Sequence, residues 1–185
     1  AILSENIAGD TVAGHAGAFA LLIDTLGRVD RNPALEIERT IALEIERMAV
    51  HIGDTAALCG DVAYQIGQVT CEALRTLVIN TMQDWCGNRF AKGLIRPGGT
   101  NFPLKPEMRN TILDRLADVN RRFLEVSDLI FGNSGILARF ENTGPASKKQ
   151  AFLAGAVGMA ARTSGIHRDL RKSPPFMAHR ELAFT

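Results

Sequence analysis

The chain has 185 residues and a mass of 20.0 kDa, and 46% of its residues are hydrophobic while 22% are charged. This composition supports a real core, and no long linker divides the chain, so we expect one helical domain over residues 1–185. The formal net charge of +1 argues against a dedicated nucleic-acid surface, and no apolar run reaches the roughly 18 residues that a membrane span requires. Three well-separated cysteines without a C-x-x-C pair indicate buried thiols rather than disulfides or a metal cluster.

Three long helices are predicted in the first half of the chain. The first covers residues 11–26 and stops at a glycine, and the second is capped by Asn32, opens with proline and covers residues 33–59. The third covers residues 62–86 and ends at a Gly-Asn pair. Between the second and third helices, Gly60 either breaks the helix or only bends it.

The second half is predicted to be less regular. Residues 95–103 are too rich in proline and glycine for regular structure, and Pro106 opens a fourth helix that ends near residue 132. Ser147 caps a short helix reaching residue 161, in which Gly155 and Gly158 would permit close approach of another backbone. We therefore predict an all-α, antiparallel helical bundle with a short irregular C-terminal segment.

The second helix carries the most informative pattern in the chain. Glu44, Arg47, His51 and Asp54 recur at steps of three and four residues, which places them on one stripe of the helix. An apolar stripe lies directly beside it, made of Ile37, Ile41, Ile45, Met48 and Ile52. Because charge next to an apolar seam tends to be buried, we expect either a structural ion-pair network or a site where protons move. His51 suits proton relay, or it fills a gap in the core beside a Glu44–Arg47 pair.

Asp61 is a second candidate for proton transfer. It follows His51 by ten positions and lies between Gly60 and an apolar pair. If the chain bends at Gly60, Asp61 stays near the centre of the bundle. The equally good alternative is that Asp61 caps the third helix.

The C-terminal segment, residues 162–175, is basic and irregular. Arg162, Asp169 and Arg171 lie in it, and one acid among basic residues is more typical of a clamp between segments than of a catalyst. The basic cluster faces either an anionic partner, an acidic neighbouring subunit or only solvent. Ser164 and the following glycine predict a tight turn.

Common nucleotide and hydrolase motifs are absent from the sequence. We find no G-x-x-x-x-G-K-[ST], no G-x-G-x-x-G after a strand, no H-E-x-x-H and no G-x-S-x-G. The corresponding chemistries are therefore disfavoured.

Taken together, these features resemble the superfamily of the respiratory complex I large subunit (the 49 kDa, quinone-module subunit) and of the energy-converting [NiFe] hydrogenase large subunits. The match rests on three ordered blocks, which are Leu43–Arg47 through His51 to Asp61, then Ile95–Gly99, then Arg162–Ile166 through Asp169–Arg171 to Pro175. The resemblance implies a hydrogenase-large-subunit-like helical bundle that packs on an iron–sulfur subunit. Since the chain starts at Ala1 and 182–185 read as the start of a strand, we expect a fragment of a longer subunit.

The resemblance also implies roles for individual residues. Glu44, Arg47, His51 and Asp61 would belong to a buried network that couples the redox cavity to proton movement. A second group would shape the quinone cavity, namely Arg96, Gly98, Gly99, Arg162 and Asp169. The fragment itself would bind no cofactor; quinone would be the substrate of the complex, an iron–sulfur cluster would lie in a partner, and NADH would be handled by another subunit. The subunit would lie peripherally on the cytoplasmic side of the inner membrane, as part of a membrane-bound complex.

One departure separates the chain from nickel enzymes. Hydrogenase relatives carry R-x-C-G-x-C shortly before a His-x-x-Ala-aromatic motif, and the latter is present here from His15. Ala8 and Thr11 stand where the two thiolates belong, and neither residue is a comparable soft ligand. We expect a nickel-free member, either of complex I or of a hydrogenase-related complex, while a scaffold subunit without catalysis is a further alternative.

Overall fold

The computed structural model describes residues 1–172 and 175–182, and these are mostly helical. In chain order the elements are η1 (Ser4–Asn6), α1 (Val12–Leu26), α2 (Pro33–Asp61), α3 (Gln65–Cys86), β1 (Ile95–Arg96), β2 (Gly99–Thr100), α4 (Met108–Phe131), α5 (Ser134–Phe140), α6 (Lys148–Leu153), α7 (Gly158–Thr163) and η2 (Met177–Arg180). The predicted strand at 182–185 falls almost wholly outside the described residues. The prediction of a mainly helical protein is confirmed.

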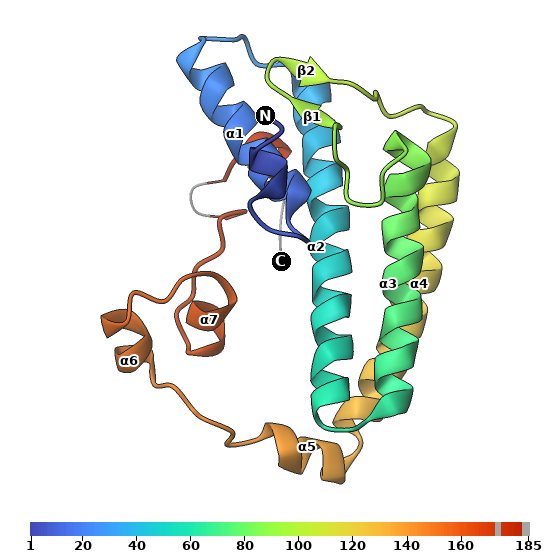
Figure 1. The fold of residues 1–185 in the computed structure, drawn as a ribbon, viewed down its shortest axis with the longest axis vertical. Coiled ribbons are helices and arrows are strands. Elements are labelled where there is room, and N and C mark those ends of the chain that lie inside the picture. Colours follow the sequence, from blue (N-terminus) through green and yellow to red (C-terminus); the bar gives the residue numbers. More distant parts are fainter. Residues whose placement is uncertain (173–174, 183–185) are drawn as a thin grey trace.

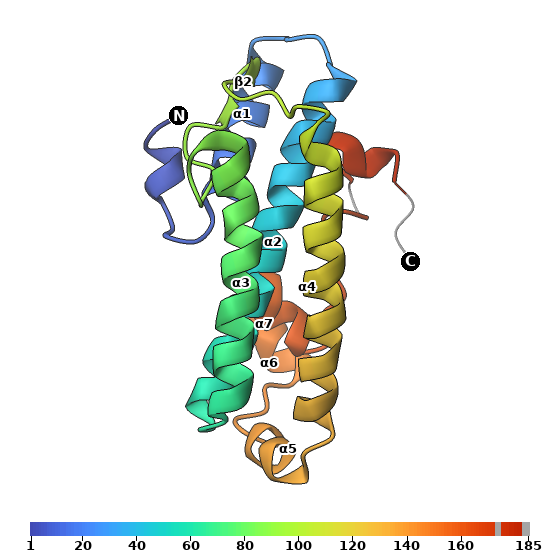
Figure 2. The ribbon, with the colours of Figure 1, turned by 90° about the vertical axis from the view of Figure 1, so that its right-hand side faces the viewer.

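Three long antiparallel helices, α2, α3 and α4, form the body of the molecule (Figures 1 and 2). Helix α1 lies beside the N-terminal half of α2, and η2 packs on the same half although it comes from the C-terminal end of the chain. Helices α5, α6 and α7 follow α4 and lead the chain back along the other side of α2. Residues from opposite ends of the sequence therefore meet at one end of α2.

Helix α2 begins as the sequence predicts and ends later. The Asn32 side chain accepts a hydrogen bond from the Leu35 amide at 3.3 Å, and proline occupies the first turn. The helix continues through Gly60, so this glycine does not break it. Its apolar stripe packs into the core through Ile45 and Ile52, whereas Ile37 in the first turns of the helix is exposed.

Helix α3 is shorter than predicted and starts at Gln65, because the chain needs residues 62–64 to reverse direction. It ends where Gly87 adopts a left-handed conformation with φ of 73°, which glycine accepts without strain. The three cysteines are free and buried between the helices, as predicted. Burial raises the pKa of Cys71 to about 11, so it remains a thiol.

The loop at residues 95–103 is more regular than predicted. Strands β1 and β2 pair antiparallel, with Arg96 opposite Gly99. Pro97 and Gly98 form the turn between them, and Gly98 has a φ of 72°. Proline followed by a glycine with positive φ is the residue pair that a type II turn requires, and this same pair had suggested irregular structure.

The C-terminal part departs most from the prediction. Helix α5 was not expected; it is capped by Asn133, whose side chain accepts from the Gly135 and Ile136 amides. The single helix expected from Ser147 is two helices, α6 and α7, because Gly155 and Gly158 both have positive φ. No atom lies within 4 Å of the position that a Cβ would take at either glycine. The two glycines therefore permit the turn between α6 and α7 and do not allow the close approach of another backbone. Ser147 forms the expected cap, with Gln150 completing a capping box.

Candidate functional site

The N-terminal residues of the charged stripe of α2 contact other side chains, whereas its C-terminal residues face solvent. Glu44 and Arg47 are partly buried and form an ion pair, with Arg47 Nε 3.1 Å from Glu44 Oε2. His51 is exposed, and so is Asp54. The expected burial is therefore wrong for the C-terminal part of the stripe, whereas Ile52 and Ala56 on another side of the same helix are buried.

Asp61 does not occupy either predicted position. It is exposed at the last residue of α2, far along the helix from Glu44, and the residue preceding α3 is Tyr64. The chain bends after Asp61 and not before it, so the residue lies at the end of the bundle and not near its centre. The structure does not bring Asp61 together with His51 or Glu44.

Glu44 is instead the centre of a network that includes residues from the end of the chain. His179 Nε2 lies 2.8 Å from Glu44 Oε1, and Arg171 Nη1 lies 4.0 Å from Glu44 Oε2. The His179 side chain is fully buried, and Ala178 beside it donates its backbone amide to Thr40 of α2. These contacts fasten the C-terminal segment to α2, so the sequence prediction of a clamp is confirmed for Arg171.

Asp169 completes the clamp. Its carboxylate accepts from the Arg171 guanidinium at 2.7 Å and from the Arg171 backbone amide at 2.9 Å. The Arg171 guanidinium holds the pKa of Asp169 well below its usual range. Asp169 is therefore an ionised anchor for Arg171 near neutral pH and not a proton donor. Gly165, with a φ of 83°, forms the predicted tight turn ahead of this pair.

The hairpin loop is held by a buried arginine that the sequence analysis missed. Arg39 is only 4% exposed and donates to Asp24 of α1 at 2.8 Å and to the Arg96 carbonyl at 2.6 Å. Asp24 in turn accepts from the Gly98 amide at 2.6 Å. The position of Arg39 between members of the apolar stripe could have indicated that it is buried. A single arginine on a helix is, however, usually a surface residue, so the sequence did not identify it.

Arg96 is anchored on the opposite side of the hairpin. Its guanidinium contacts the Glu5 carboxylate of η1 at 2.5 Å, and Glu5 also accepts from the Gly93 amide at 3.0 Å. Glu5 is buried. The predicted Arg-Pro-Gly-Gly loop thus joins η1, α1 and α2, which explains why its conformation is fixed.

A cavity of about 630 Å³ brings several of these residues together. We call it the α1–α2 cavity; it lies between α1, the N-terminal half of α2 and the chain from α7 to η2. Arg47, Arg162 and Asp169 from the predicted site line it, together with Arg39. Neither the hairpin residues Arg96, Gly98 and Gly99 nor His51 and Asp61 line it. Arg39 links the hairpin to the cavity wall.

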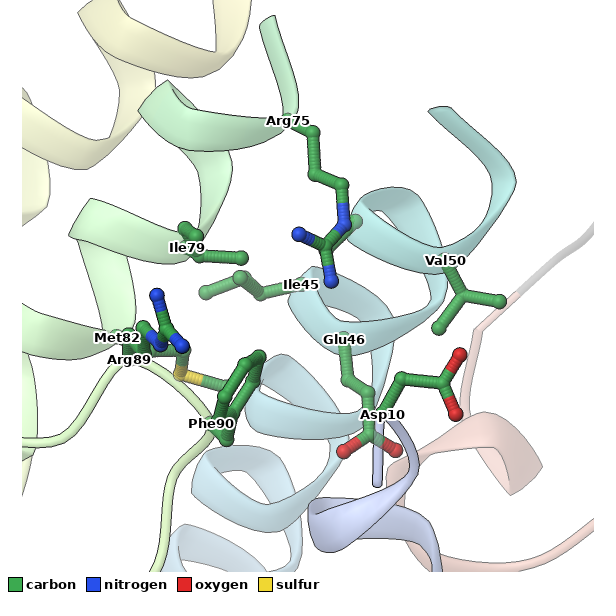
Figure 3. Close-up of a pocket in the computed structure, with 10 residues that line it drawn as sticks. Asp10, Ile45, Glu46, Val50, Arg75, Ile79, Met82, Arg89 and Phe90 are labelled. Atoms are coloured by element: carbon green, nitrogen blue, oxygen red, sulfur yellow. The ribbon is translucent and has the colours of Figure 1, made fainter. Parts of the chain in front are cut away.

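A second, much smaller pocket lies between α2, α3, the loop after α3 and Asp10, which precedes α1 (Figure 3). Its volume of about 20 Å³ has room for about one water molecule. The Asp10 and Glu46 carboxylates lie on one side, and the Arg75 guanidinium points toward them across Ile45. Glu46 accepts from the first amides of α1, at 2.5 Å from Ala13 and 2.9 Å from Gly14.

Glu46 therefore replaces the missing side-chain cap of α1, since Thr11 makes no such hydrogen bond. Burial raises the pKa of Glu46, and the backbone amides of Gly14 and Ala13 oppose this shift. The role of Glu46 has no local signal in the sequence, because a cap supplied by another helix leaves no periodic or neighbouring pattern. Its function is structural: it fixes the start of the helix that forms one wall of the α1–α2 cavity.

The two residues that the sequence resemblance placed at the nickel-thiolate positions lie just ahead of α1. Ala8 and Thr11 precede α1, and His15 lies one turn into it. Among the described residues, no group of three or more histidine, cysteine or acidic side chains is placed to hold a metal ion. A methyl group and a hydroxyl do not supply soft ligands, so these residues do not fit a thiolate-bound nickel. In the same described part of the chain, no helix has the length and apolarity needed to cross a bilayer.

The chain is similar to one known protein family and to individual members of it. A sequence model of the family described as "Respiratory-chain NADH dehydrogenase, 49 Kd subunit" matches residues 61–185. Among similar proteins is the D subunit of NADH-quinone oxidoreductase from Helicobacter pylori, 29% identical over 90% of this chain and 41% of the relative. The protein of the same name from Thermosipho melanesiensis is 24% identical over 90% and 45% of the two chains, and that from Campylobacter concisus is 28% identical over 95% and 43%. The chain spans less than half the length of these relatives.

Proposed function

Because the chain belongs to the family of the 49 kDa subunit of respiratory-chain NADH dehydrogenase, we propose that it forms part of the large subunit of an NADH:quinone oxidoreductase complex. In that complex it contributes to the quinone cavity and to proton coupling beside an iron–sulfur subunit. The observation that carries the proposal is the α1–α2 cavity, which joins Arg47 of α2 to Arg162 and Asp169, more than a hundred positions later. Two blocks that are distant in sequence thus line one space large enough for a small organic ligand.

The quinone head would lie against the polar side of this cavity. Arg162 and Arg47 supply hydrogen-bond donors there, and Asp169 fixes the neighbouring Arg171. The hairpin residues Arg96, Gly98 and Gly99 do not line the cavity and affect it indirectly. They hold Arg39 in place on the cavity wall. Electrons come from the iron–sulfur cluster of the partner, and NADH is oxidised by another subunit of the complex.

We keep the proposed role of His51 and Asp61 in proton coupling, but at the surface of the chain and not in a buried network. Both are exposed on the described chain, so they act where α2 meets another part of the complex. Glu44 and Arg47 support the cavity end of the same helix through their ion pair. Within the membrane-bound complex, the subunit lies peripherally on the cytoplasmic side of the inner membrane.

The first test is the composition of the complex. The tagged full-length subunit is isolated from native membranes in mild detergent, and the intact assembly is analysed by mass spectrometry. We expect an iron–sulfur subunit, antiporter-like membrane chains and flavin subunits that oxidise NADH. Absence of the flavin subunits alone would favour a hydrogenase-related complex without nickel, and recovery of the subunit alone would contradict the proposal.

The second test uses the exposure of His51 and Asp61. His51→Ala and Asp61→Asn change side chains that are exposed on the described chain, so both variants should fold normally, and mass spectrometry of the isolated complex checks that they assemble. We expect each to abolish coupled NADH:quinone turnover. Asp54→Asn on the same exposed surface is the matched control. Normal coupled activity in both test variants would reject their proposed role.

A scaffold function is the second candidate, favoured by the Glu44 network. Glu44 contacts His179 and lies near Arg171, so it holds the C-terminal segment on α2 whether or not protons move. A scaffold predicts that Glu44 variants lose stability in proportion to any loss of activity. Loss of turnover in a Glu44→Gln complex with an unchanged melting temperature would reject it.

A further inference from the structure

The charges around the α1–α2 cavity do not cancel. Five arginines line it, and Asp169 is its one acidic lining residue among those that the structure describes. Three of these arginines are neutralised by carboxylates, in the pairs Arg39–Asp24 at 2.8 Å, Arg47–Glu44 at 3.1 Å and Arg171–Asp169 at 2.7 Å. Two positive charges remain, those of Arg162 and Arg168.

Arg162 and Arg168 are free to meet a ligand. Both are exposed, and neither forms a hydrogen bond or an ion pair through its side chain with any part of the chain that the structure describes. Both also line an adjoining hollow of about 580 Å³, to which His167, Lys172 and the Arg171-paired Asp169 contribute. The mouth of the cavity is therefore positive, whereas its interior is electrically balanced.

The interior of the cavity suits an apolar body. Leu43 from α2, Leu21 from α1 and Phe176 line it, and the glycines and alanines of α1 leave a wall with few side-chain atoms. A positive mouth on an apolar cavity favours a ligand whose ring lies inside and whose negative group lies at the entrance.

We propose that Arg162 and Arg168 bind an ionised oxygen, so that the cavity takes ring-hydroxylated quinones in their anionic form in preference to neutral quinones of the same size. The inference rests on the proposed function for the choice of a quinone. The preference for a negative charge rests on the unbalanced arginines alone. A comparison of neutral and anionic quinones of one ring size therefore tests the charge preference separately from the binding of quinones.

The test is a binding measurement on the full chain by isothermal titration calorimetry. The probes are 1,4-naphthoquinone, which is neutral, and 2-hydroxy-1,4-naphthoquinone, which is an anion at neutral pH. Dodecanoate provides an anionic head on a flexible chain, and inorganic phosphate provides the negative charge alone. We expect the hydroxynaphthoquinone to bind about tenfold more tightly than naphthoquinone, and rising salt to remove the difference.

Variants identify the residues. Arg168→Gln should weaken binding of the hydroxynaphthoquinone about two- to fivefold and leave naphthoquinone unchanged, as removal of one exposed charge contact predicts. Arg162→Gln also removes a hydrogen-bond donor to the quinone head, so it should weaken binding of both probes, and of the hydroxynaphthoquinone more. Arg109→Gln on α4, an exposed position away from the cavity, makes the same change in net charge and should alter neither probe. Circular dichroism of all variants establishes that they are folded.

Each outcome has one meaning. Equal binding of the two naphthoquinones, or an effect of Arg109→Gln as large as that of Arg168→Gln, would overturn the proposed charge preference and leave the proposed function intact. Binding of dodecanoate or phosphate as tight as that of the hydroxynaphthoquinone would overturn the assignment to quinones. Failure of both naphthoquinones to bind would contradict the quinone cavity of the proposed function as well.

Discussion

His179 Nε2 lies 2.8 Å from Glu44 Oε1, although 135 residues separate the two in the chain. The contact closes the C-terminal segment over α2 and places Arg171 within 4.0 Å of the same carboxylate. One acidic side chain thereby serves Arg47 on its own helix and two residues from the far end of the sequence. The α1–α2 cavity has a fixed wall on this side because of that carboxylate.

Replacing Glu44 should loosen this wall. We expect Glu44→Ala to lower the free energy of unfolding by about 1–3 kcal/mol, because the buried His179 loses an acceptor. Glu44→Gln keeps one acceptor oxygen and should lose less. Denaturant unfolding of both variants measures the difference, with Asp54→Ala as the exposed control on the same helix. Equal stability of wild type and Glu44→Ala would mean that the segment is held by other contacts.

Arg39 should be the costliest charged side chain to remove. Arg39→Met keeps the apolar stem but leaves the Asp24 carboxylate and the Arg96 carbonyl without their donor. Breaking a buried pair in this way typically costs roughly 3–5 kcal/mol, so the melting temperature should fall by many degrees. Arg31→Met, which breaks an exposed pair with Glu36, is the matched control and should melt close to wild type. A similar small effect of both would contradict the bridging role of Arg39.

The sequence predicted the long helices well because their signals are local. Asn32 and Pro33 mark the start of α2, and the spacing of Ile45 and Ile52 identifies the buried side. The break between α6 and α7 was missed, since a glycine that adopts positive φ looks the same in sequence as one that allows close packing. The distinction depends on what surrounds it in space.

The site was predicted less well than the fold, for a related reason. Periodicity placed Glu44, Arg47 and His51 on one stripe, but it could not show which part of the stripe another segment covers. The covering segment carries His179, which has no pattern of its own. Contacts across the chain between single residues, such as those of Arg39 and Glu46, leave no periodic signal.

The hairpin turn depends on Gly98. Its φ of 72° is unfavourable for any residue with a side chain, although no atom lies near the position that a side chain would take. We expect Gly98→Ala to lower the free energy of unfolding by about 1–2 kcal/mol, from backbone strain alone. Gly99→Ala meets equally open space without a positive φ and is the control. Chemical denaturation measures both variants. An equal loss in the free energy of unfolding would mean that backbone strain at Gly98 does not cause the destabilisation.

The stability of the α1 cap should depend on pH through Glu46. Burial raises its pKa in the folded chain, so the folded state binds this proton more tightly than the unfolded state does. The resulting stability is complete below the unfolded pKa and is lost as the pH rises through the folded pKa. Glu46→Gln cannot ionise, so its stability relative to wild type should increase as the pH is raised from about 4 toward 7. Its lost hydrogen bond to one of the α1 amides adds an offset that does not vary with pH. Urea unfolding across this range measures the difference; a decrease with pH would mean that the Ala13 and Gly14 amides outweigh burial.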